Sequence, residues 1–258
     1  MHIVMFLTLV AGGFFGGYYG AAVGSAGLIS VPLLILFGFS PYMAVATTRP
    51  AAFALETASA VRYWRDGKLS PEHIRKGIIL GLFGSIGAVA GAVIIGAVSD
   101  QVLRLLFALV ISSMLLFLIT KKDWGTRERH ERAKNMAMLS LVTMLTGIYG
   151  GFFGFTFGTL MTIVLVWFGC TLLQGAALSR IIGMFTSVAA TAVFVSKGSI
   201  DYPAALALGI GFGFGGWMGA GASSKKGNAY IKKLLVIVVV VSVLKLLWDF
   251  VQVHSSLG

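Results

Sequence analysis

The sequence is short of cysteine, of clustered histidine and of nucleotide-binding motifs, and each shortage excludes a class of protein. Cys170 is the only cysteine among 258 residues, which excludes a disulfide framework and a cysteine-based metal cluster. The four histidines lie in polar segments or near the chain ends, far from one another, so neither a haem or zinc site nor a Ser-His-Asp triad is indicated. A G-x-x-x-x-G-K-S/T phosphate-binding loop is missing as well. We therefore expect no enzyme, no metal site and no cofactor.

Charged residues are also scarce. They make up 11 % of the chain, whereas about 25 % is usual in soluble domains. Apolar residues make up 57 %, no charged residue precedes Arg49, and a second uncharged run covers residues 135–179. These proportions predict a multi-pass protein of the lipid bilayer. The net charge of +11 lies mostly in short loops, where it indicates membrane topology, so we expect no nucleic-acid partner.

Apolar stretches separated by proline, glycine and charge predict an all-helical fold in two parts. The first membrane repeat is expected over residues 1–120, a basic cytoplasmic linker over 121–135 and the second repeat over 136–258. The predicted helical segments are 1–23, 28–39, 42–61, 77–98, 102–119, 136–157, 159–168, 171–195, 203–222 and 234–251.

The two parts repeat each other in sequence. An offset of 134 residues superimposes five glycines of the opening segment on five glycines of the second part, and it places Tyr18-Tyr19 on Phe152-Phe153. After a three-residue gap, an offset of 131 pairs Arg49 with Arg180. Internal repeats of this kind are frequent in secondary transporters.

The basic loops predict how the chain is oriented. Fifteen of the 20 Lys and Arg residues lie in the ranges 62–76, 121–134 and 225–233. Placing these three loops in the cytoplasm leaves both termini outside. Each half then crosses the membrane an odd number of times, so the two repeats are expected to have inverted topology.

The second segment of each half is too short to span a bilayer. Residues 28–39 would form a helix of about 18 Å, whereas the hydrocarbon core is ~30 Å thick. We therefore expect each half to begin with a re-entrant or broken helix pair, followed by three spanning helices. The tips of the pairs are expected at residues 24–27 and 154–158. Five full crossings in each half remain an alternative with the same odd parity.

Three charged residues lie inside the apolar segments. Ser40-Pro41 is a typical helix start, which places Arg49 about 12 Å along the axis and near the bilayer centre. Arg180 lies at the corresponding depth in the inverted repeat. Arginine is costly at that depth and offers a planar fork of donors suited to oxyanions, so we expect the pair to bind an anionic substrate. Glu56 is expected either to carry a coupling proton or to pair with an arginine.

Residues at the tips and beside the arginines are expected to complete the substrate site. Backbone N–H groups at a short helix start, together with neighbouring hydroxyl groups, suit anion binding. The expected members are Gly24, Ser25, Thr48, Gly158, Thr159 and Ser179. Glycines spaced by four residues elsewhere are interpreted as close helix-packing positions, which permit a homo-oligomer without requiring one.

Several stretches of the sequence resemble the TauE/SafE sulfite exporter family. They are GGFFGGYYGAAVGSAGLISVPLLILFGFSP, AVATTRPAA and VRYWRDGKL in the first half, and GIYGGFFGFTFG, GAALSRIIG and VFVSKGSI in the second. The resemblance runs from about residue 10 to about residue 250. It implies a secondary transporter of small sulfur-containing anions in a prokaryotic cytoplasmic membrane. The family often has consecutive glycines where this chain has Gly24-Ser25-Ala26-Gly27, a departure that bears on substrate choice.

The expected function is therefore export of sulfite or a small organosulfonate across the cytoplasmic membrane by alternating access. Two alternatives stay open. The chain could be an uptake carrier or a channel for another small anion, or it could be a non-transporting membrane partner protein.

Overall fold

The regular structure of the described residues is entirely helical, as predicted. The computed structural model describes residues 3–99, 101–103, 136–154 and 156–255, and no strand occurs among them. Most of the predicted segment 102–119, and the basic linker 121–135, lie outside the described residues. The helices are α1 (Ile3–Val23), α2 (Gly27–Leu36), α3 (Pro41–Arg65), α4 (Pro71–Ile95), α6 (Met136–Phe152), α7 (Phe157–Trp167), α8 (Leu172–Ser196) and α9 (Tyr202–Ser255).

The two helices that carry the intramembrane arginines begin at hydroxyl caps. In α3, the Ser40 side chain accepts the backbone N–H of Met43 at 3.3 Å, and Pro41 occupies the first turn, as the sequence predicts. In α8, Thr171 accepts the N–H of Gln174 at 3.1 Å, and Gln174 accepts the N–H of Thr171 in return. Both helices are 25 residues long, so their starts fix the depth of the arginines within them.

Each half opens with a helix pair interrupted at glycine. The chain leaves α1 through Gly24 (φ +93°) and leaves α6 through Gly154 (φ +69°), both in the left-handed region that side chains disfavour. The helices that follow, α2 and α7, have only 10 and 11 residues. α6 ends at Phe152, earlier than the predicted residue 157, because the turn begins at Gly154.

The predicted segments 203–222 and 234–251 form the two helical parts of α9, which meet at a kink. Within α9 only Gly227 departs from helical dihedral angles, with φ +70°. The two predicted segments are therefore separate helices, and the break between them lies at Gly227, within the polar stretch. The Ser and Lys residues on either side of Gly227 extend the two helices toward the break.

Glycines let the long helices approach backbone to backbone, as interpreted from their spacing. A Cβ atom on Gly211, Gly215 or Gly219 of α9 would collide with backbone atoms of α1. The same is true of Gly87 and Gly91 of α4 against the backbone of α6. The first helix of each half therefore packs tightly against a helix of the other half.

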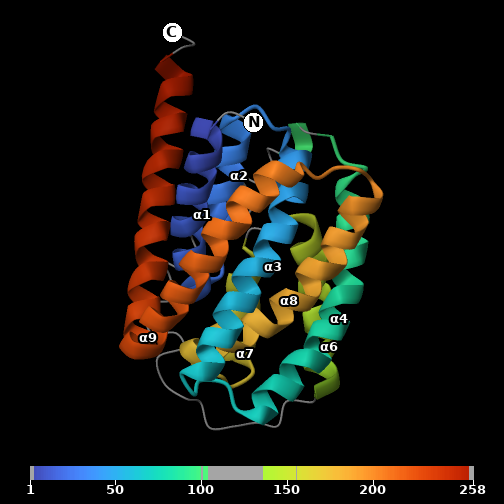
Figure 1. Cartoon of the computed structure of the whole chain (residues 1–258), viewed down its shortest axis with the longest axis vertical. Coiled ribbons are helices and arrows are strands. Elements are labelled where there is room, and N and C mark those ends of the chain that lie inside the picture. The colour runs from blue at the N-terminus through green and yellow to red at the C-terminus, as the bar shows by residue number, and fades with distance from the viewer. Residues whose placement is uncertain (1–2, 100, 104–135, 155, 256–258) are drawn as a thin grey trace.

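The arrangement in Figure 1 runs the matching helices of the two halves in opposite directions. α3 starts at the end of the molecule where α1 begins, whereas α8 starts at the far end. α9 descends to its kink and then returns, so that α1 begins and α9 ends at the same end of the molecule. This arrangement supports the prediction that the repeats are inverted and that both termini lie on one side.

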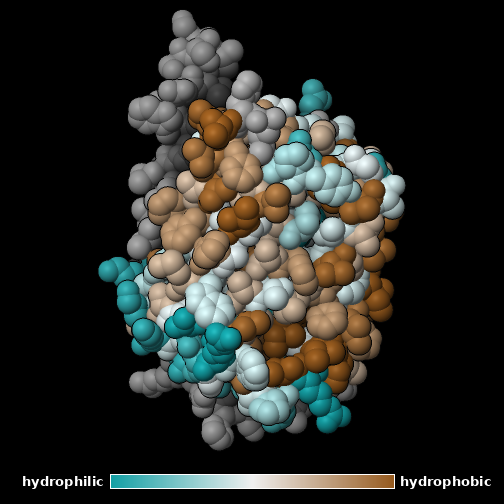
Figure 2. Space-filling model, viewed as in Figure 1, coloured by the Kyte–Doolittle hydropathy of each residue, from teal (hydrophilic) through white to brown (hydrophobic). Residues whose placement is uncertain are grey.

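The surface suits a bilayer. In the part of the chain that the structure describes, four helical stretches are long and apolar enough to cross a membrane: Ile3–Val23, Pro71–Ile95, Leu172–Ser196 and Tyr202–Ile231. Figure 2 shows hydrophobic side chains over the middle of this face and hydrophilic side chains gathered mainly toward one end. The protein is a multi-pass membrane protein.

Candidate functional site

Arg49 lies inside the protein with part of its guanidinium group unpaired. It is only 5 % exposed and its Nη1 donates to the carbonyl oxygen of Gly150 at 3.2 Å. Its Nε is buried and has no hydrogen-bond partner. The guanidinium group also lies against the α-carbon of Gly154, where any side chain would collide with it. An unpaired buried donor is costly, so this group is ready to bind an acceptor.

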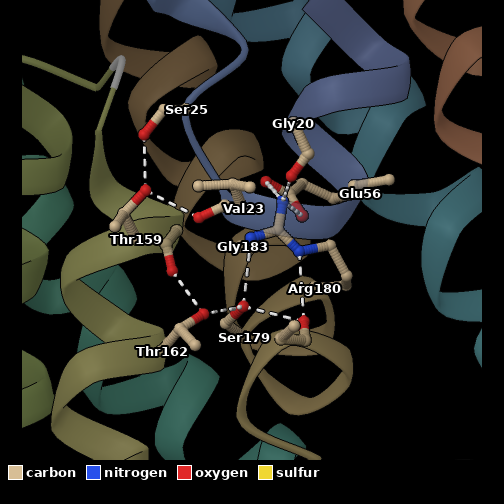
Figure 3. A network of polar contacts seen from close by, with 12 residues as sticks. Gly20, Val23, Ser25, Glu56, Thr159, Thr162, Ser179, Arg180 and Gly183 are labelled. Atoms are coloured by element: carbon tan, nitrogen blue, oxygen red, sulfur yellow. Dashed lines mark hydrogen bonds and ion pairs between the residues drawn. The ribbon is translucent and has the colours of Figure 1, made fainter. Parts of the chain in front are cut away.

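Arg180, in contrast, uses all of its nitrogen atoms. Nε donates to the carbonyl oxygen of Ala176 at 3.3 Å, Nη2 to the Ser179 hydroxyl at 3.0 Å, and Nη1 to the carbonyl oxygen of Gly20 at 3.2 Å. Nη1 also lies 3.0 Å from Oε2 of Glu56 and donates to its Oε1 at 3.2 Å. Figure 3 shows these contacts converging on one guanidinium group.

Glu56 therefore pairs with one arginine across the helices. Its carboxyl group lies against the α-carbon of Gly183, so the missing side chain there makes room for the ion pair between α3 and α8. The alternative that Glu56 pairs with an arginine is borne out, whereas a proton-coupling role stays a prediction. The two arginines are thus unequal: Arg180 has a carboxylate partner, and no ion pair of Arg49 occurs among the described residues.

The two helix breaks touch each other. The backbone of Gly24 lies in direct contact with that of Gly158. The hydroxyl groups of Ser25 and Thr159 are hydrogen-bonded, and Thr159 also donates to the carbonyl oxygen of Val23 at 2.6 Å (Figure 3). Two of these contacts, Gly24 with Gly158 and Ser25 with Thr159, join residues that are 134 positions apart, which is the offset of the sequence repeat. Residues that the repeat offset makes equivalent therefore meet where the two halves adjoin.

A small cavity of about 30 Å³ lies beside this contact. A water molecule needs roughly 10–15 Å³ by the same measure, so the cavity has room for a few atoms only. Its lining residues come from both halves: Gly24, Ala26, Gly27, Ser30, Thr48, Arg49, Ala52, Leu55, Glu56, Gly154, Phe157, Gly158, Arg180, Ser187 and Phe212.

Most of the predicted site residues line this cavity, and three do not. The lining includes both arginines and Glu56, together with Gly24, Thr48 and Gly158. Ser25, Thr159 and Ser179 lie outside it, because their hydroxyl groups are used in the tip contact and in holding Arg180.

The comparison with protein families agrees with this architecture. The model of the sulfite exporter TauE/SafE family matches residues 9–246. The chain belongs to that family. The TauE/SafE match covers both arginines and both helix breaks, so the protein is a membrane transporter.

Curated relatives of this TauE/SafE protein are similar over nearly their whole lengths. A probable membrane transporter protein of Sinorhizobium sp., ORF9, is 26 % identical over 96 % of this chain and 94 % of its own. A probable membrane transporter protein of Haemophilus influenzae is 24 % identical over 92 % of each chain. The probable membrane transporter protein YfcA of Escherichia coli K12 is 23 % identical over 96 % of this chain and 89 % of its own. No solved structure matches the chain.

Sequence reasoning missed several lining residues of the TauE/SafE site. Gly154 lies in the tip that the sequence predicts at residues 154–158, and Ser187 could have been found because the repeat offset pairs it with Glu56. Phe157 is the residue next to the predicted member Gly158. Phe212 comes from α9, and nothing in its sequence surroundings marks it as a neighbour of the arginines.

Proposed function

We propose that the protein is a secondary transporter that exports sulfite or a small organosulfonate across the prokaryotic cytoplasmic membrane by alternating access. The observation that carries the proposal is Arg49: a buried guanidinium group that borders a cavity and has a donor without a partner. A positive charge at membrane depth is retained when it serves a substrate or a partner. A sulfonate or sulfite group supplies several oxygens, which suit the planar fork of arginine.

The helix breaks add backbone donors to the same place. α2 and α7 begin beside the cavity, and the first N–H groups of a helix have no partner within it. Those of Leu28, Ile29 and Thr159 donate to carbonyl oxygens of the preceding break. The N–H groups of Gly27 and Gly158 are therefore the candidate donors to an anion. Broken helices that point their starts at an anionic substrate are a recurring feature of secondary transporters. We propose Gly24, Gly158 and Thr48 as substrate neighbours. Ser25, Thr159 and Ser179 would act by fixing the tips and Arg180.

The contact between the halves is suited to alternating access. The cavity is lined by α2, α3 and the break after α1 in the first half and by α7, α8, α9 and the break after α6 in the second, so a relative movement of the halves would open it to one side. Its small volume corresponds to a closed arrangement. We place both termini outside, with the basic end of α3, the basic start of α4 and the lysines around the α9 kink facing the cytoplasm.

Glu56 is our candidate for a coupling proton. Its carboxylate faces Arg180 at 3.0 Å, and Arg49 is the other charged residue of the cavity lining. Protonation would remove the charge that compensates Arg180 and would add one positive charge to the site. Proton binding and anion binding would then favour each other.

The test is counterflow in liposomes that contain the purified protein. Vesicles loaded with unlabelled sulfite are diluted into a trace of labelled sulfite at equal pH. A carrier accumulates the label transiently and saturates, and competition by organosulfonates ranks the substrates. Flux without counterflow would indicate a channel. No flux of any anion, from protein shown to be folded, would indicate a non-transporting partner protein.

A further inference from the structure

We infer that the site accepts a monovalent oxyanion and discriminates against divalent ones, with Glu56 as the residue that sets this preference. The inference deepens the proposed anion transport and rests on it. It follows from the charges that line the cavity, together with their burial.

The formal charges of the cavity lining do not cancel. Among the described residues that line the cavity, only three have ionisable side chains, namely Arg49, Arg180 and Glu56. Each is less than a tenth exposed. While Glu56 is ionised, its ion pair with Arg180, 3.0 Å away, cancels two of the charges. One positive charge, that of Arg49, remains for a substrate.

The helix dipoles at the cavity do not change this count. α2 and α7 begin there and contribute partial positive charge at their first turns. α1 and α6 end at the same two breaks and contribute partial negative charge at their last turns. Because the opposed ends adjoin each other, they largely offset, and the formal charges decide the balance.

Because the site is buried, this charge balance favours monovalent over divalent anions. A monoanion bound to Arg49 leaves the site neutral, whereas a dianion leaves one negative charge without a partner among apolar neighbours such as Leu55, Phe157 and Phe212. A buried charge that lacks a partner is strongly unfavourable. We expect a discrimination of at least about tenfold in transport efficiency, which corresponds to about 1.4 kcal/mol.

The asymmetry between the repeats makes Glu56 the determinant. Its repeat counterpart is Ser187, which also lines the cavity but bears no charge. Had both positions been carboxylates, both arginines would be compensated. Had both been hydroxyls, the site would hold two uncompensated charges. This pair of residues therefore sets the net charge that the substrate must match.

The experiment compares two anions of similar size and shape, methanesulfonate and sulfate, in the same proteoliposomes at neutral pH. The wild type should transport methanesulfonate at least about tenfold more efficiently than sulfate. Glu56→Gln adds one positive charge to the site and should narrow or reverse that ratio by at least about tenfold. Glu72→Gln makes the same chemical change at the exposed start of α4 and should leave the ratio unchanged.

Each outcome decides the inference. Equal efficiency for the two anions in the wild type would overturn it while leaving anion transport intact. A Glu56→Gln protein that keeps the wild-type ratio of methanesulfonate to sulfate transport would also overturn it. If Glu56→Gln does not fold, the wild-type ratio and a double variant test the inference. The double variant Glu56→Gln/Ser187→Glu keeps the net charge of the site and should keep the preference for the monoanion. No wild-type transport of either anion, or of sulfite, would overturn the proposed function itself.

Discussion

At the scale of single residues, the account depends on two arginines that are alike in sequence but differ in their partners. The sequence predicts that Arg49 and Arg180 lie at membrane depth, because each sits well inside an apolar helix with a defined start. It does not predict which of them pairs with Glu56. That choice depends on how α3 crosses α8 and on the space that Gly183 leaves, neither of which has a sequence signature.

Arg180→Gln should lower the free energy of unfolding, because Arg180 holds the Glu56 carboxylate in the folded protein. The change leaves the Glu56 carboxylate buried without its partner, which costs about 3–5 kcal/mol. The matched control is Arg62→Gln. Its ion pair with Asp66 is about a quarter exposed, and loss of that pair should cost about 1 kcal/mol or less. The Arg62 guanidinium carbon also lies 5.3 Å from the centre of the Trp217 ring, a contact that contributes about 0.5–1 kcal/mol. Thermal unfolding in detergent measures both variants. Equal effects would mean that the buried pair has no structural role.

Gly154→Ala should abolish anion transport. A Cβ atom there would occupy the place of the Arg49 guanidinium group, and the φ of +69° adds backbone strain of about 1–2 kcal/mol. Gly198→Ala is the matched control, because Gly198 has a similar φ of +62° and no atom within 4 Å of an added Cβ. Sulfite flux should therefore fall in the first variant and persist in the second. Loss in both would assign the effect to backbone strain alone.

At the scale of helices, glycine and proline predict most of the boundaries. The starts of α3 and α8 and the break after α1 were predicted from Ser, Thr, Pro and Gly at those positions. The two predicted segments of α9 are separate helices as well, but the polar residues between them are helical on both sides of Gly227, so the break is shorter than predicted. Similarly, the glycine spacing predicts close packing but does not identify the partner helix.

Gly91→Leu should separate α4 from α6 and lower the stability of the protein. The added side chain would meet the backbone of α6 near Ile148, and overpacking of this kind costs about 1–3 kcal/mol. Gly213→Leu is the matched control, because a Cβ atom on Gly213 meets no atom within 4 Å. The melting temperature in detergent should fall for the first variant and stay level for the second. An equal fall in the melting temperatures of both variants would mean that Gly91 does not stabilise the protein by letting α4 and α6 pack closely.

At the scale of the whole molecule, the internal repeat is the sequence feature that explains most of how the two halves are arranged. The repeat offset pairs Gly24 with Gly158 and Ser25 with Thr159, and the structure brings these residues into contact. The offset could therefore have predicted where the halves meet. It could not have predicted the contribution of Phe212, because α9 enters the site through packing that is specific to the folded protein.

The predicted orientation can be tested with cysteines at opposite ends of the molecule. Lys197 lies at the end of α8, where its Nζ reaches the carbonyl oxygen of Val93 near the end of α4, and Glu72 lies in the first turn of α4. In a Cys170→Ser background, a membrane-impermeant maleimide added to intact cells should label Lys197→Cys and not Glu72→Cys. Both should be labelled in opened cells. Labelling of Glu72→Cys alone in intact cells would reverse the orientation.

The most direct test of the central claim is saturable sulfite flux into proteoliposomes with wild-type protein and with Arg49→Gln. The account predicts saturable wild-type flux that falls about 10- to 100-fold in Arg49→Gln, as expected for the loss of a charge-assisted hydrogen bond. Arg65→Gln, an exposed cation at the end of the same helix, should retain the flux. Wild-type flux that is unchanged in folded Arg49→Gln protein would contradict the claim that Arg49 binds the transported anion.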